Sequence, residues 1–148
     1  MGIITGSEPV GTTYTSTDGA GVGAWVWRKR PTGWEVVDGD TGWRNVKADA
    51  LTTPSQLGIR RVGALVIVAG EHQSAPSTET AVYVPPPGLS PQAGPARFVA
   101  GVSGNGGRVI IGGQDGSIRV IGGGTWARFS ITTTTADTWP STLPGSPA

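Results

Sequence analysis

The alternation of apolar and polar residues predicts short β-strands along most of the chain. The first three runs are separated by turns that contain proline or glycine, and they cover residues 24–30, 34–37 and 43–46. In the first run, Trp25 and Trp27 are expected on one face of the strand, with Val26 and two arginines on the other. Together the three runs predict a small β-meander rich in tryptophan.

In the rest of the chain the alternating runs follow one another at the spacing typical of a sandwich or barrel. They cover residues 59–62, 65–69, 79–84, 96–102, 108–112, 117–121 and 125–133. Gly63 predicts a hairpin, and a second hairpin is expected to set Val109 and Ile111 against Ile118 and Val120. No ten-residue stretch has helical periodicity with caps. The predicted fold is therefore all-β, with the meander followed by a jelly-roll-like antiparallel β-sandwich.

This pattern divides the chain into three parts. Residues 1–22 are polar and rich in glycine, threonine and serine, and we expect them to form an extended lead-in. Residues 23–50 hold the tryptophan-rich meander, and residues 51–148 hold the sandwich. The stretch 46–56 has room for a helical turn but contains Pro54, and we interpret it as a linker.

Composition indicates a folded chain. The 25 glycines and 12 prolines reach the level at which disorder becomes a candidate. Six tryptophans, many valines and isoleucines and a net charge of only +1 are the reverse of a disordered composition. The low net charge predicts no polyanionic partner. The absence of cysteine excludes disulfides, thiolate metal sites and thiol nucleophiles.

The residues offer little for catalysis or for a cofactor. The glycine-rich strings at 18–25 and 101–108 lack the following helix, or the lysine, of a phosphate-binding loop. His72 is the only histidine, which excludes multi-histidine metal sites and most nucleophile–base pairs. Asp38 and Asp40 could form a glycosidase pair, but aspartates in a polar turn usually bond to local backbone. We therefore expect no enzyme activity, no cofactor and no metal.

The WVWRKR segment combines aromatic and cationic residues, as single-stranded nucleic-acid sites do. Glu35, Asp38 and Asp40 lie across the predicted hairpin, however, and would pair with the arginines or repel phosphate. Sugar binding is the more favoured alternative, because an indole stacks on the apolar face of a pyranose. The competing interpretation is that the tryptophans pack between subunits, since three short strands cannot bury a core alone.

The N-terminal MGIITGSEPVG lacks the positive region and the apolar run of a signal peptide. No segment of the sequence approaches the length of a transmembrane helix. We therefore expect no membrane insertion, and release by a route such as cell lysis if the protein acts outside its cell.

The order of segments resembles that of minor tail proteins, or tail fibres, of phages that infect actinobacteria. The matching segments lie within residues 11–145 and read GTTYTSTDGAGVGAWVWRKRPTGWEVVDGDTGWRNV, LGIRRVGALVIVAG, AVYVPPPGLSP, RVIIGGQDGSIRVI and TWARFSITTTTADTWPSTLPG. The resemblance implies a homotrimeric virion appendage, assembled in the host cytoplasm with other tail proteins. It also implies recognition of the host cell surface through a cell-wall saccharide, with no catalytic residues.

On this hypothesis the meander is a trimer-forming neck whose indoles lie between subunits: Trp25, Trp27, Trp34 and Trp43. The sandwich is then the distal head, and its ligand-binding loops are expected to include His72, Asp115, Trp126 and Trp139. Two alternatives stay open. One is a structural virion protein, such as a capsid decoration or a tail-tip scaffold, without a receptor role. The other is a monomeric carbohydrate-binding module.

Overall fold

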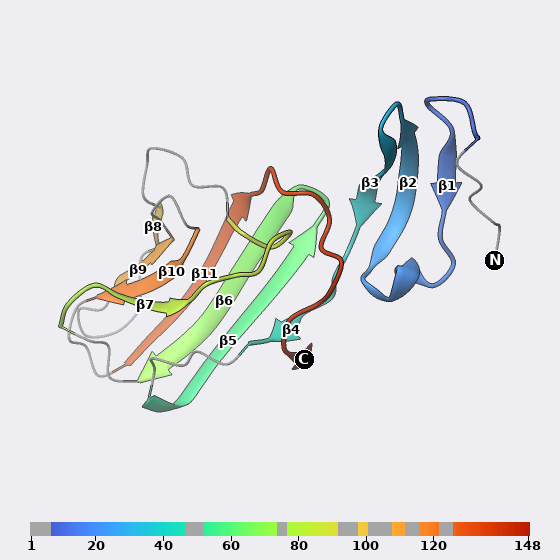
Figure 1. The fold of residues 1–148 in the computed structure, drawn as a ribbon. Coiled ribbons are helices and arrows are strands. Elements are labelled where there is room, and N and C mark those ends of the chain that lie inside the picture. The colour runs from blue at the N-terminus through green and yellow to red at the C-terminus, as the bar shows by residue number, and fades with distance from the viewer. Residues whose placement is uncertain are drawn as a thin grey trace.

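The structure, a computed structural model, describes residues 7–46, 52–73, 77–91, 98–100, 108–111, 116–121 and 126–148. These residues confirm the all-β prediction, with one 3-10 turn, η1, at Gly19–Gly21 (Figure 1). The strands are β1 Thr13–Thr15, β2 Ala24–Arg30, β3 Gly33–Gly39, β4 Arg44–Asn45, β5 Thr52–Val62, β6 Leu65–Gln73, β7 Thr80–Tyr83, β8 Phe98–Ala100, β9 Arg108–Ile111, β10 Ile118–Ile121, β11 Trp126–Thr134 and β12 Ser146–Pro147.

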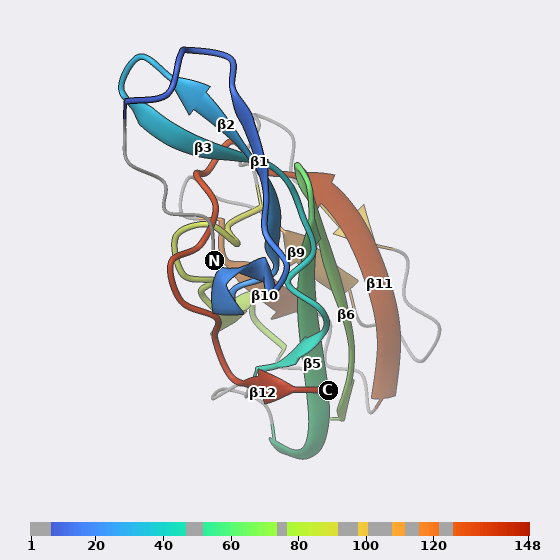
Figure 2. The ribbon, with the colours of Figure 1, turned by 90° about the vertical axis from the view of Figure 1, so that its right-hand side faces the viewer.

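Two antiparallel sheets pack face to face as a sandwich (Figure 2). One has the strand order β11-β6-β5-β4-β12 and the other has the order β7-β10-β9-β8. Apolar side chains of both sheets share one core, in which Ile59, Val68, Ile118 and Val120 are fully buried. In the second sheet β8, β9 and β10 pair in succession and β7 lies beside β10, which is the strand order of a Greek key, a connection that jelly rolls use.

Both predicted hairpins are confirmed. Val62 pairs with Leu65, and Gly63 between them has a φ of 55°, the left-handed conformation that tight hairpin turns require. In β9 and β10, Val109 lies opposite Val120, which is the expected match. Both hairpins join strands that are close together in the chain, so the alternation of apolar residues and the turn residues were enough to predict them.

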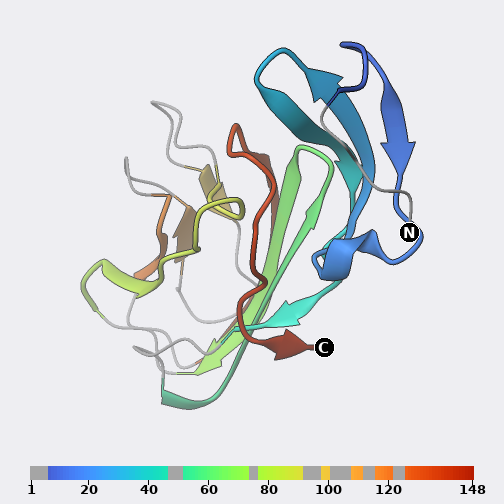
Figure 3. The same cartoon turned by 45° about the vertical axis from the view of Figure 1, so that its right-hand side comes forward.

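The third strand of the predicted meander is present as β4, but its predicted place in the meander is wrong. β4 pairs with β5 and with the C-terminal strand β12, so it belongs to the five-stranded sheet (Figure 3). A strand of only two residues has little intrinsic preference for one sheet over another, so it pairs where partner backbone groups are available. Here Val46 N donates to Leu57 O at 2.9 Å, and Ala148 N donates to Trp43 O at 3.1 Å.

Two further segments differ from the predictions. Within the expected lead-in, β1 pairs with β2 as an edge strand. Within the expected linker, β5 already begins at Thr52. The small sheet therefore has the order β1-β2-β3 and stands beside one end of the sandwich (Figure 1). Gly63 N donates to Gly39 O at 2.9 Å, and Thr41 N to Arg61 O at 3.0 Å, where the small sheet meets the sandwich.

Candidate functional site

One face of the small sheet is aromatic. The register places Tyr14 beside Trp27, Trp27 beside Val36, and Lys29 beside Trp34. Cross-strand partners project to the same face of a sheet, and these five side chains are all half-buried. The other face is polar and exposed, with side chains that include Thr13, Thr15, Arg28, Arg30 and Glu35. The small sheet is therefore amphipathic, with one aromatic, half-buried face and one polar, exposed face.

The small sheet borders a cleft of about 640 Å³, whose opposite wall is the C-terminal segment 136–141. Trp27, Trp34 and Val36 line the cleft from the sheet, and Trp139 lines it from the C-terminal segment. Two indoles of the β2–β3 hairpin and a third from the distant C-terminal segment thus line one opening. The size, and the combination of aromatic walls with a few polar groups, are typical of small-molecule sites.

Trp139 is fixed in place by the small sheet. Its Nε1 donates to Val22 O at 3.0 Å. Its ring lies close against Gly39, where a Cβ would come within 2.6 Å of two ring carbons. The sequence marked Trp139 as a ligand-binding candidate, and the structure shows that this side chain also joins the C-terminal segment to β3. Its ring is therefore a rigid wall of the cleft.

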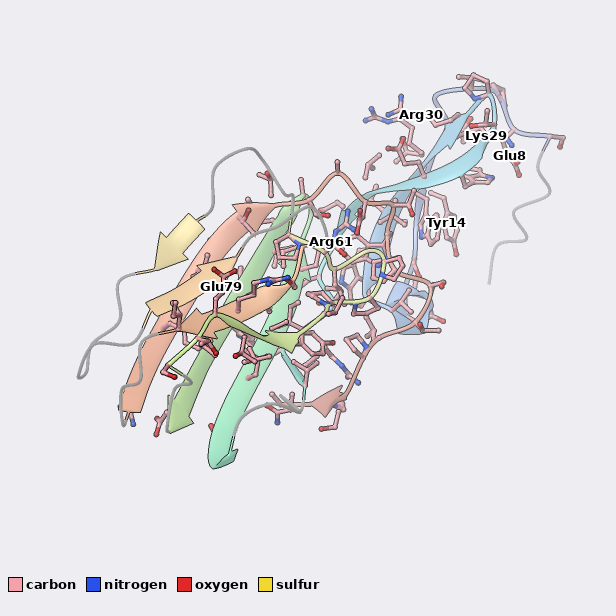
Figure 4. The ribbon with its side chains drawn as sticks, turned by 60° about the vertical axis from the view of Figure 1, so that its left-hand side comes forward. Glu8, Tyr14, Lys29, Arg30, Arg61 and Glu79 are labelled. Atoms are coloured by element: carbon pink, nitrogen blue, oxygen red, sulfur yellow. The ribbon has the colours of Figure 1, made fainter. Side chains whose placement is uncertain are left out.

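Arg61 anchors the C-terminal segment next to Trp139. Only 6% of the residue is exposed, and its guanidinium lies 4.7 Å from the Trp139 ring centroid (Figure 4). It donates to four backbone carbonyls, those of Gly63, Gly88, Asp137 and Thr138, at 2.6 to 3.0 Å. Burial lowers the pKa of Arg61, and the nearby Asp137 opposes this effect. A guanidinium remains charged in proteins, so it can serve all four carbonyls.

Neither Arg61 nor Asp137 was expected from the sequence to take part in a site. The signal was present, because Arg61 occupies the position after Leu57 and Ile59 on the buried side of the alternation. A cation at a core position requires several acceptors. Asp137 is likewise bonded to backbone groups, since its carboxylate accepts from Gly88 N at 2.9 Å and from Ser90 N at 3.3 Å.

The charges at the cleft are largely compensated within the chain. Arg30 Nε bonds to Glu35 Oε2 at 2.5 Å, and Asp137 and Arg61 are occupied as described. At the far end of the small sheet, Lys29 Nζ lies 5.9 Å from the Trp34 ring centroid (Figure 4). The Nε1 of Trp34 is buried and has no hydrogen-bond partner among the described residues. A cleft with paired charges and aromatic walls suits an uncharged ligand with apolar faces and hydroxyl groups.

The four indoles predicted to share a subunit interface do not form one surface. Trp27 and Trp34 line the cleft. Register shifts on both sides of Val26 interrupt the alternation, and Trp25 is 41% exposed, with its ring over Gly19. Trp43 lies on the sandwich, against Gly58.

The other predicted ligand-binding residues fall elsewhere. His72, expected in a loop, lies in β6 and pairs with Ala127, which corrects that expectation. Trp126 begins β11 and pairs with Gln73, next to that position. The side chains of His72 and Trp126, and all of Asp115, lie outside the described residues.

Asp40, one of the two carboxylates of the possible glycosidase pair, is bonded within the chain. Asp40 Oδ1 accepts from Arg60 Nε at 2.8 Å and from Gly42 N at 2.8 Å. The bond from Arg60 lowers the pKa of Asp40 despite its partial burial, which is the reverse of what a general acid needs. Within the described ranges, no three His, Asp or Glu residues are grouped as metal ligands.

In the part of the chain that the structure describes, there is no helix of the length and apolar character needed to cross a membrane. Comparisons with protein-family models, with curated proteins and with solved structures find no match to this chain.

Proposed function

We propose that this chain is a non-enzymatic recognition protein of a phage tail and that its cleft binds a saccharide of the host cell surface. The observation that supports binding is that Trp27, Trp34 and Trp139 line one cleft, whose charged side chains are already bonded within the chain. The resemblance of the segment order to actinobacteriophage tail proteins supports the tail location. Other tail proteins are the expected partners, and no cofactor or metal takes part.

A saccharide matches the chemistry of this cleft. Each pyranose ring has a face of C–H groups that can stack on an indole, and a rim of hydroxyls that needs donors and acceptors. The cleft offers indole rings together with the polar groups of Thr32, Ser141 and backbone at its walls. A rigid wall lowers the cost of ordering the site on binding, and Arg61 supplies that rigidity.

The proposal includes a homotrimer. Among the described residues 7–39, Ala24 is the only buried apolar residue, so the small sheet has no core of its own. Packing of small sheets around a symmetry axis would supply the missing burial. Light scattering on a sizing column should give about three times the 15.1 kDa mass of the chain. A monomeric mass would count against the neck and favour a monomeric carbohydrate-binding module.

Trp27→Ala is expected to weaken saccharide binding by about tenfold, which corresponds to roughly 1.4 kcal/mol. Removing the indole takes away a stacking surface in the wall of the cleft. Binding would be measured as adsorption of labelled protein to host cells and as quenching of tryptophan fluorescence by soluble cell-wall saccharide.

Trp25→Ala is the matched control, because this indole is more exposed and lies outside the cleft. Equal binding by the two variants would contradict the assignment of the cleft. A Trp27→Ala variant that becomes monomeric would instead assign the indole to the subunit interface, so light scattering accompanies each binding measurement.

A further inference from the structure

A second hollow lies on the outer face of the five-stranded sheet, away from the aromatic cleft. It has a volume of about 480 Å³ and is open to solvent, with Trp43 and Asn45 at one end. The Trp43 ring packs against Gly58, where a Cβ would lie 3.2 Å from the nearest ring carbon. The ring therefore rests on the backbone of β5, and the half-buried indole lines the hollow.

The strand register explains the shape of this hollow. Gly58 pairs with Ala69, and neither side chain rises far above the sheet. The neighbouring row consists of long polar residues, since Gln56 pairs with Glu71 and Glu71 pairs with Arg128. All five of these residues line the hollow. The result is a depression across the strands, with hydrogen-bonding side chains along one side and an indole at one end.

The charges of this hollow compensate one another. Arg128 Nε donates to Glu71 Oε2 at 2.6 Å, so the pair adds no net charge. Gln56 and Asn45 are exposed amides that can both donate and accept. An anionic polymer would meet Glu71, and an apolar peptide would bury the ion pair without a replacement for water. A chain of neutral sugars would offer hydroxyls to the polar row and a C–H face to Trp43.

We propose that this hollow is a second binding site, for an uncharged oligosaccharide that lies across β5, β6 and β11 with one sugar on Trp43. The inference rests on the proposed function only for the ligand class, because the two sites share no lining residue. Two modest sites on one chain would increase adsorption to a repetitive cell-wall polymer through avidity.

The test is affinity electrophoresis of the full chain in gels that contain the neutral polysaccharide fraction released from actinobacterial cell walls. Trp43→Ala is expected to reduce retardation by about fivefold to tenfold, which corresponds to roughly 1 to 1.4 kcal/mol. Gly58→Ala is a second variant that keeps the indole but tilts it, because the added methyl group would press on the ring. It should weaken binding in the same direction. Trp25→Ala is the control and should migrate like the wild type.

The outcomes separate the two sites. If Trp43→Ala and Gly58→Ala migrate like the wild type while Trp27→Ala is less retarded, the second site is refuted and the cleft stands. If only the Trp43 and Gly58 variants lose retardation, the cleft assignment fails and the second site stands. A wild type that this neutral fraction does not retard overturns the second site. A Trp43→Ala variant with a lower molar mass also overturns it and makes the hollow a contact between copies of this chain.

Discussion

Gly23→Ala should lower the free energy of unfolding by about 3 kcal/mol, the sum of a left-handed backbone penalty and a steric clash. Gly23 has a φ of 70°, a conformation that costs an alanine about 1 to 2 kcal/mol. The added Cβ would also overlap the backbone carbonyl of Asp40 and come within 2.9 Å of Thr41 Cα. That approach cannot relax cheaply, because Asp40 N donates to Gly23 O at 2.8 Å and holds the two segments together.

Gly21→Ala isolates the steric part of this effect. Gly21 has a φ of 74°, almost the same as Gly23, and a Cβ there would have no atom within 4 Å. Its substitution should therefore cost only the backbone penalty of about 1 to 2 kcal/mol. Urea unfolding monitored by tryptophan fluorescence would measure both variants. If they lose the same stability, the close approach of residue 23 to the 40–41 backbone is not a constraint on the fold.

The second large effect is expected at the buried arginine. Arg61→Ala should cost about 3 to 5 kcal/mol, the range seen when one partner of a buried charged network is removed. Four backbone carbonyls would lose their donor at once, and buried acceptors without partners are expensive. Trp139 would also lose the guanidinium beside its ring.

Arg60→Ala is the neighbouring control. This side chain pairs with Asp40, and about a third of each side chain is exposed (33% for both). Such pairs contribute about 0 to 1 kcal/mol, so Arg60→Ala should be nearly neutral. Urea unfolding compares the two, and Arg61→Lys would show whether charge alone suffices. Equal losses at positions 60 and 61 would contradict the structural role assigned to Arg61.

Stability and recognition are coupled through this arginine. Arg61 fixes residues 137 and 138, and Trp139 follows them directly as a wall of the cleft. A milder variant that loosens this segment is therefore expected to weaken saccharide binding before it unfolds the chain. The cleft depends on a contact between segments that lie about half the chain apart in sequence.

Several parts of the fold follow from the sequence because they depend on neighbouring residues. Alternation and Gly63 determined the β5–β6 hairpin, and the same reasoning paired Val109 with Val120. The all-β class follows from many short alternating runs between turn residues. The aromatic character of residues 25–34 was visible too, and two of its indoles now line the candidate site.

The places where the indoles lie could not be read from the sequence. Trp43 precedes a two-residue strand, and that strand joins the sandwich because β5 and the C-terminal β12 offer it backbone partners. Trp139 reaches the small sheet because Val22 O accepts its Nε1 and Gly39 leaves room for its ring.

The sequence by itself thus determined most of the strands, the tight turns and the supply of aromatic residues, all of which depend on residues close together in the chain. The tertiary structure alone decided which indoles meet. The positions of the indoles depend on backbone groups and on a buried arginine that are far away in the sequence. The local pattern of residues contains no information about these distant partners.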